Sequence, residues 1–115
     1  MSEERRRADR LPVDLGGVLF LAGGRSVAVR IRNMGAMGAL VQIPDLEVSV
    51  LEGDRIVLEH PVFAPDATPD VFAASERMRT AGAVVRVELD FEVEGVKREL
   101  AVYFDGGAEP EGYEG

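Results

Sequence analysis

The chain has 115 residues, 46% of them hydrophobic but only 6% aromatic, with a formal net charge of −8 and no cysteine. This length predicts one domain whose single core is packed mainly by aliphatic side chains. The lack of cysteine excludes disulfides, thiolate metal sites and a cysteine nucleophile, and it is typical of a reducing compartment. No apolar run approaches the roughly 20 residues of a membrane span, and the start does not resemble a signal peptide. We therefore expect a cytoplasmic protein without membrane insertion.

Positive charge is concentrated at the start of the chain. Arg5, Arg6, Arg7 and Arg10 are four of its thirteen Lys and Arg residues. Guanidinium groups match phosphate oxygens and stack on flat rings, so this cluster is a candidate nucleotide clamp. On charge alone, a flexible and solvated basic arm over residues 1–10 is the simpler interpretation. The remainder of the chain is acidic, which argues against binding to DNA or RNA.

The basic arm is followed by two strands. An apolar run over residues 12–22 and an alternating run over 27–32 are separated by a Gly-Gly pair, which is typical of a β-hairpin. A second glycine pair, Gly16-Gly17, lies inside the first run and predicts a bulge or a sharp bend.

Two further strands are expected in the middle of the chain. A tight turn over 33–38 leads into an apolar strand over 39–43, which Pro44 ends. The turn signal at 52–54 then precedes a short strand over 55–59.

Residues 60–81 are the least strand-like part of the sequence. Three prolines space out a loop, and Thr68-Pro69-Asp70 has the residue types of a helix start, with Thr68 as the N-cap. We expect a short helix that runs to about Met78.

The last third of the chain alternates strictly between apolar and charged residues. A two-residue loop at Glu94-Gly95 would pair the strand from Val84 with a strand over 96–104, so that their apolar residues share one face. Arg98 is the one charged residue expected on that face. The carboxylates of the opposite face have the period of a solvated sheet, which does not indicate catalysis or calcium binding.

About six short strands predict an all-β protein, a small six-stranded antiparallel β-barrel with one short helix in the 60–81 insertion. The expected organisation is a flexible basic arm over 1–10, a barrel domain over 11–105, and an acidic tail over 106–115. The tail has too little apolar surface to fold, so we expect it to be disordered.

Several short motifs follow one another at the expected strand boundaries. They are Arg-x-x-x-Arg (Arg6, Arg10), Leu-Pro-Val-Asp-Leu, Asn-x-Gly-x-x-Gly (Asn33, Gly35, Gly38), Gly-Asp-Arg-Ile-Val-Leu and Gly-Ala-Val-Val-Arg. Each motif alone is weak, but their order resembles that of the PilZ domain family over about residues 5–105. The resemblance implies a six-stranded barrel that serves as a receptor for the bacterial second messenger cyclic di-GMP.

The resemblance also implies the ligand-binding residues. Arg6 and Arg10, with Arg7 as an additional group, would bond the phosphates and guanine edges and stack on the bases. Asn33 would bond a guanine edge through its amide, and Gly38 would let the backbone approach or bend where a side chain would clash.

Gly35 stands where the family has a serine. The missing hydroxyl would cost on the order of 1 kcal/mol, or roughly tenfold in affinity. Another explanation of Asn33 and Gly35 is a permissive turn that needs positive backbone φ angles.

Two functions therefore remain. The first is a cyclic di-GMP receptor that changes its basic arm and its interaction surface on binding, and so regulates an effector protein in motility, pili, polysaccharide synthesis or signalling. The alternative is a degenerate PilZ module that binds proteins without the messenger. A homodimer is compatible with either. No enzyme, metal or cofactor is expected, because His60 has no second histidine or cysteine to act with and is interpreted as a surface or packing residue.

Overall fold

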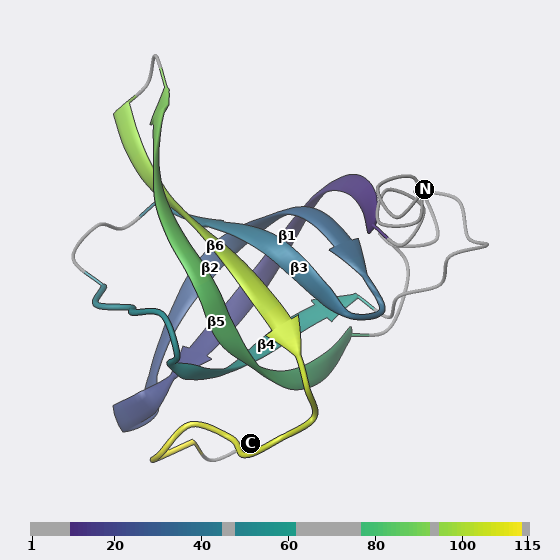
Figure 1. Cartoon of the computed structure of the whole chain (residues 1–115), viewed down its shortest axis with the longest axis vertical. Helices are drawn as coiled ribbons and strands as arrows, with labels where there is room; N and C mark the ends of the chain where they lie inside the picture. Colours follow the sequence, from purple (N-terminus) through teal and green to yellow (C-terminus); the bar gives the residue numbers. More distant parts are fainter. Residues whose placement is uncertain (1–9, 45–47, 62–76, 93–94, 114–115) are drawn as a thin grey trace.

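A computed structural model describes residues 10–44, 48–61, 77–92 and 95–113 of the chain. Six strands form a closed antiparallel β-barrel (Figure 1), which confirms the predicted fold class. The elements are β1 (Arg10–Leu21), the 3₁₀ turn η1 (Ala22–Gly24), β2 (Arg25–Gly35), β3 (Gly38–Ile43), β4 (Arg55–Pro61), β5 (Arg77–Glu92) and β6 (Gly95–Phe104). The helix predicted from Thr68 falls largely outside the described residues, and its expected end at Met78 is strand.

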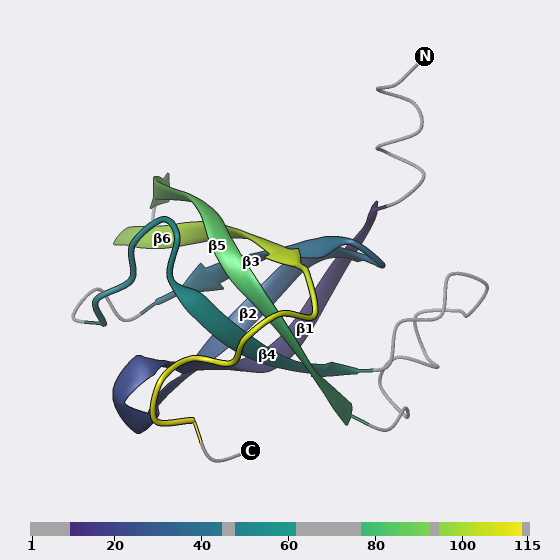
Figure 2. The same cartoon turned by 60° about the horizontal axis from the view of Figure 1, so that its bottom comes forward.

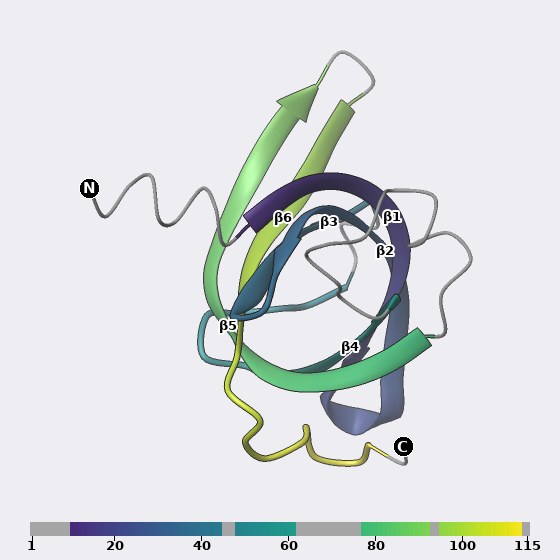
Figure 3. The ribbon, with the colours of Figure 1, turned by 90° about the vertical axis from the view of Figure 1, so that its right-hand side faces the viewer.

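The strands follow the order β1-β2-β3-β6-β5-β4 around the barrel, and pairing between β1 and β4 completes the ring (Figure 3). Closure gives each of the six described strands a partner on both sides over at least part of its length. Inward-facing aliphatic side chains from all six strands fill the interior, which contains no described charged residue. The buried core cluster comprises Leu19, Leu21, Val29, Ile31, Met34, Ala39, Val41, Ile43, Val50, Ile56, Leu58, Val84, Leu100 and Val102.

The β5–β6 hairpin has a different register from the predicted one. Glu92 pairs with Gly95, so the expected loop at Glu94-Gly95 is wrong. The pairing is displaced by two residues, and because strand side chains alternate with period two, the apolar residues of both strands still share a face. Val87 accordingly lies opposite Leu100.

The apolar row of β5 is not buried along its whole length. Val87 packs against the core, but Leu89 is 56% exposed. The reason is that β5 pairs with β4 only up to Ala83, and β6 pairs with β3 only from Arg98 onward. The far end of the hairpin therefore projects beyond the barrel (Figure 1), where no neighbouring strand covers it.

Gly16 and Gly17 do not form the predicted bulge. Both pair regularly with β2, and the register shift of β1 lies earlier, between Pro12 and Leu15. Gly17 instead allows a close approach of strands, because a Cβ there would lie 2.8 Å from the carbonyl oxygen of Glu59. That approach is where β1 meets β4 and the barrel closes.

Residues 105–113, called here the post-barrel segment, differ from the expected disordered tail. They run along the outside of the barrel towards the β1–β2 turn (Figure 2). Asp105 forms an ion pair with Arg55, Pro110 is buried, and the carbonyl oxygen of Glu111 accepts a hydrogen bond from the Gly23 amide. Composition predicts too little apolar surface for folding, but polar contacts with the barrel hold this segment.

His60 is a packing residue, one of the two interpretations drawn from the sequence. Its side chain is 2% exposed and stacks on Phe104 with ring centroids 5.7 Å apart. Nδ1 donates to the Pro61 carbonyl oxygen at 2.6 Å, which leaves Nε2 to accept from the Thr80 hydroxyl at 2.8 Å. Burial lowers the pKa of His60 below its usual value, against the opposing effect of the Pro61 hydrogen bond.

We expect stability to fall as the pH drops below about 6.5, the pKa of an unperturbed histidine. Below that pH, His60 takes up a proton in the unfolded chain but not in the folded protein. The free energy of unfolding therefore falls by at most about 1.4 kcal/mol per pH unit, until the pH drops below the pKa of His60 in the folded protein. Urea denaturation between pH 7.5 and 5.5 measures this loss. His60→Gln removes the only histidine and should flatten the dependence, whereas an equal slope in both proteins would contradict this assignment.

Gly82→Ala should destabilise the barrel. A Cβ at Gly82 would overlap the carbonyl oxygen of Tyr103 on the paired strand β6, and backbone cannot move aside cheaply. We expect a loss of about 1–3 kcal/mol in the free energy of unfolding. Gly16→Ala is the matched control, because a Cβ there meets nothing within 4 Å. It should change the stability by less than about 0.5 kcal/mol, and equal losses in the two variants would refute the overlap.

Candidate functional site

Arg10, the last residue of the predicted basic arm, lies next to the 33–38 bend. Arg10 is the first residue of β1, and its Cα partner on β2 is Gly35. The next pair is Leu11 with Met34. Arg6 and Arg7 lie outside the described residues. The register therefore brings the backbone of the last arginine of Arg-x-x-x-Arg directly beside the central glycine of the second motif.

The bend is tighter than the sequence indicates. Asn33 and Gly35 still belong to β2, and the turn itself consists of Ala36 and Met37. The carbonyl oxygen of Met37 accepts a hydrogen bond of 2.9 Å from the amide of Phe104, which ties the turn to the end of β6. No described residue other than glycine has a positive φ angle, and Gly35 has none either. The explanation of Asn33 and Gly35 as positions that need positive φ is therefore wrong.

Gly38 has a packing role. It opens β3 and pairs with Tyr103 on β6. A Cβ on Gly38 would overlap the carbonyl oxygen of Val102, so the two strands approach too closely for a side chain. The close approach at Gly38 is therefore to β6, and the part of Gly38 in ligand binding stays a prediction.

Asn33 carries an unpartnered polar atom. Its Oδ1 is buried and accepts no hydrogen bond from the described part of the chain. Buried acceptors are nearly always paired, because leaving one unpaired costs about 1–3 kcal/mol. The Asn33 amide therefore presents an acceptor suited to a donor that these residues do not supply.

Asn33 does not lie on the core face of β2. The core side chains on either side of it are Ile31 and Met34, three residues apart, because the β2–β3 register shifts between Ile31 and Asn33. The extra residue is Arg32. Both Arg32 and Asn33 consequently lie off the core face, where Asn33 pairs with Leu40 of β3.

Arg32 is the residue near the site that sequence reasoning missed. It is exposed, and its Nη1 donates to Oε1 of the buried Gln42 at 3.3 Å. The alternating pattern over 27–32 indicated only that Arg32 belongs to the solvated face. No sequence signal indicates that Arg32 shares a face of β2 with Asn33. That arrangement results from the register shift between Ile31 and Asn33, which depends on the pairing of β2 with β3.

A second arginine of β2 is neutralised by a carboxylate. Arg30 forms a two-pronged ion pair with Asp14, which lies in the irregular part of β1. The hydrogen bond from Arg30 holds the pKa of Asp14 below its usual value, so this carboxylate stays ionised at neutral pH. The pair is exposed and contributes little to stability. Because Arg30 compensates the charge of Asp14, this carboxylate does not act on Arg32 as an isolated negative charge.

The described residues offer little support for a reactive histidine, a metal site or a membrane-spanning helix. Both ring nitrogens of His60 have partners inside the protein. Among residues 10–44, 48–61, 77–92 and 95–113, no group of three or more His, Cys, Asp or Glu side chains could hold a metal ion. No helix in the same ranges has the length and apolar character that crossing a membrane requires.

Neither protein-family models nor curated protein sequences match this chain. A comparison with solved structures does find similarity. The PilZ domain of YcgR from Escherichia coli, solved with c-di-GMP, superimposes with a TM-score of 0.64 over 86% of this chain and 76% of that chain. The two sequences are 9% identical, so the likeness concerns the fold. The chain therefore has the fold of a PilZ domain.

Proposed function

We propose that this chain is a receptor for cyclic di-GMP. In this proposal Arg6, Arg7 and Arg10 bind the phosphates and bases from one side. Asn33, Gly35 and Gly38 form the other side of the site. Ligand binding orders the basic arm over the outer face of the barrel, changes the surface offered to an effector protein, and so regulates that protein in the cytoplasm.

The pairing of Arg10 with Gly35 is the observation that carries the proposal. Arg10 ends the first motif, 23 residues before Asn33 begins the second. Its backbone is nevertheless adjacent to Gly35 in the barrel, which supports a single small ligand that contacts both motifs. The comparison structure adds support, because a PilZ domain of the same fold was solved with c-di-GMP.

The chemistry of the bend is compatible with a guanine. The edge of guanine offers N–H donors, and Oδ1 of Asn33 is a buried acceptor without a described donor. The exposed guanidinium of Arg32 beside it suits a phosphate or a ring face. Cyclic di-GMP has two phosphates and two guanines, so a few arginines suffice to bind it.

Gly35 is the weak point of the site. A glycine supplies no hydroxyl for the ligand or for the bend, and we expect this to lower the affinity roughly tenfold. The same observation favours a second function, a PilZ-fold module that binds a partner protein without the messenger.

Titration calorimetry with cyclic di-GMP tests the receptor. We expect saturable binding by the native chain, and a roughly ten- to hundredfold loss of affinity in Arg6→Ala and in Arg10→Ala, since each removes a charge-assisted hydrogen bond. Arg25→Ala is the matched control. Arg25 begins β2 at the other end of the strand from Gly35, and its Nε donates to the nearby Ala22 carbonyl oxygen at 3.0 Å. Absence of heat with the native chain at high micromolar ligand would favour the messenger-independent module.

Gly35→Ser tests whether the bend faces the ligand. Restoring the hydroxyl should tighten binding about tenfold. Gly16→Ser is the control, because it adds a hydroxyl at an exposed strand position with open space. Since Gly35 is buried, thermal unfolding is measured in parallel to establish that the variant folds. A folded Gly35→Ser protein with unchanged affinity would remove Gly35 from the site.

A further inference from the structure

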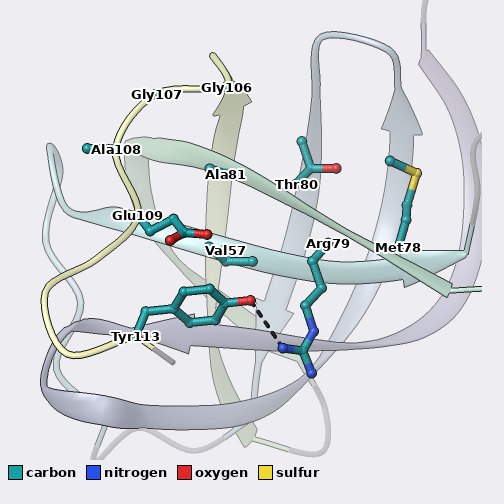
Figure 4. A pocket seen from close by; sticks show the side chains of 10 residues that line it. All are labelled: Val57, Met78, Arg79, Thr80, Ala81, Gly106, Gly107, Ala108, Glu109 and Tyr113. Carbon is teal, nitrogen blue, oxygen red and sulfur yellow. Dashed lines mark hydrogen bonds between the residues drawn. The ribbon is translucent and has the colours of Figure 1, made fainter. Parts of the chain in front are cut away.

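The post-barrel segment lies in a groove on the outside of the barrel. The groove is bounded by β4, by the first residues of β5 and by the β1–β2 turn, and Figure 4 shows the part between β4, β5 and the segment. It is separate from the Asn33 bend. The contacts of residues 105–113 with this groove describe a binding site for a short peptide that forms neither helix nor strand and turns near both of its ends.

Arg55 holds the beginning of the segment. Its Nη1 and Nη2 donate to the two carboxylate oxygens of Asp105 at 2.6 and 2.7 Å, and its Nε donates to the carbonyl oxygen of Ala108 at 2.8 Å. The amide of Gly106 donates to the Ala81 carbonyl oxygen. One guanidinium thus recognises both a carboxylate and the peptide backbone three residues later, a geometry that a planar fork of donors provides.

Tyr113 and Arg79 hold the end of the segment. Nη1 of Arg79 donates to the Tyr113 hydroxyl at 3.1 Å (Figure 4). The same guanidinium lies 4.5 Å over the ring of Phe20, and the Tyr113 ring meets that ring edge-on at 5.4 Å. The backbone is bound here as well, because the Gly23 amide donates to the Glu111 carbonyl oxygen at 2.7 Å.

The floor of the groove is apolar. Val57 of β4 is 2% exposed, yet it does not belong to the core cluster of its neighbours Ile56 and Leu58. It lines the groove together with Ala81 (Figure 4). An apolar surface on the outside of a barrel requires a cover, and residues 105–113 supply it.

The segment does not fill the groove. Tyr113 lines two hollows, each of about 570 Å³. One is bounded by Val57, by β5 and by the segment, and the other by Phe20, by the η1 turn and by Gly112. Both hollows are open to solvent, so the segment leaves part of the groove uncovered.

The charged anchors of the segment lie near the solvent. The side chains of Arg55 and Asp105 are 29% and 32% exposed, and that of Arg79 is 40% exposed. Ion pairs of this kind contribute about 0–1 kcal/mol. Covalent linkage supplies the segment at an effective concentration in the millimolar range, so a competing peptide of higher affinity can replace it.

The charges in the groove favour a peptide over a polyanion. Glu59 contacts both Arg77 and Arg79, and Asp105 occupies Arg55. A nucleic acid would have to approach these carboxylates and a chain of net charge −8. An occupant with one well-placed carboxylate and one aromatic ring meets no such repulsion.

We propose that this groove is a docking site for a segment of a partner protein, and that residues 105–113 are its resident occupant. The fitting segment carries a carboxylate for Arg55 and has a tyrosine eight residues later, as Asp105 and Tyr113 do. It also turns after the carboxylate and before the tyrosine, where the resident segment has Gly106 and Gly112 with positive φ angles. Docking displaces the resident segment. The site does not depend on cyclic di-GMP.

The test uses a synthetic peptide of residues 105–113 and the full chain labelled with ¹⁵N. Tyr113→Ala loosens the resident segment, so the variant should bind the peptide at least about tenfold more tightly than the native chain. The amides of Gly23 and Ala81 should shift. Tyr103→Ala, which removes the other tyrosine from an exposed strand position away from the groove, should behave like the native chain.

Adding Arg79→Ala to Tyr113→Ala should reduce peptide binding again, and Arg6→Ala should leave it unchanged. The last result separates this site from the ligand site of the proposed receptor. No shifts in Tyr113→Ala at several millimolar peptide, or equal binding by all variants, would overturn the docking site. A dimer of the native chain in light scattering would identify a second copy as the occupant and would also contradict the proposal.

Discussion

Closure of the barrel through β1 is the constraint on which the rest of the structure depends. β1 pairs with β2 along most of its length and with β4 through Val18–Phe20. The second pairing requires a glycine at position 17, because a Cβ there would lie 2.8 Å from the carbonyl oxygen of Glu59. Once the ring is closed, each strand has two partners, and one register sorts the side chains of every strand into core and solvent faces. The same register joins Arg10 to Gly35.

Closure also sets the two surfaces that matter for function. The end of β6 lies between them, because the Phe104 amide bonds the Met37 carbonyl oxygen of the bend and the next residue, Asp105, bonds Arg55 at the groove. At the bend, Arg32 is exposed and Oδ1 of Asn33 is a buried acceptor without a donor among the described residues, and the proposed function assigns this surface to a nucleotide. The groove presents an apolar floor between two arginines, which suits a peptide. In the two proposals, a single small barrel offers two kinds of recognition chemistry on separate parts of its outer face.

The candidate site was only partly predictable. Arg10, Asn33 and Gly38 could be chosen from motif order, and the structure brings the backbones of Arg10 and Gly35 together. Arg32 was missed because its position beside Asn33 results from a register shift against β3, and a bulge of that kind depends on the partner strand. The bulge predicted at Gly16-Gly17 was also misplaced, because the true position again depends on the partner strand. Glycine occurs both at bulges and where two strands approach closely, and the sequence does not distinguish the two uses.

The sequence by itself determined the number of strands and the approximate position of most of them, because alternation and turn residues act over a few neighbouring positions. It also carried the motif order that pointed to the PilZ fold. Only the tertiary structure decided that Leu89 is exposed, that Val57 needs an outer cover, and that residues 105–113 are bound. Those outcomes depend on contacts between residues distant in the chain, such as Arg55 with Asp105, which no local pattern contains.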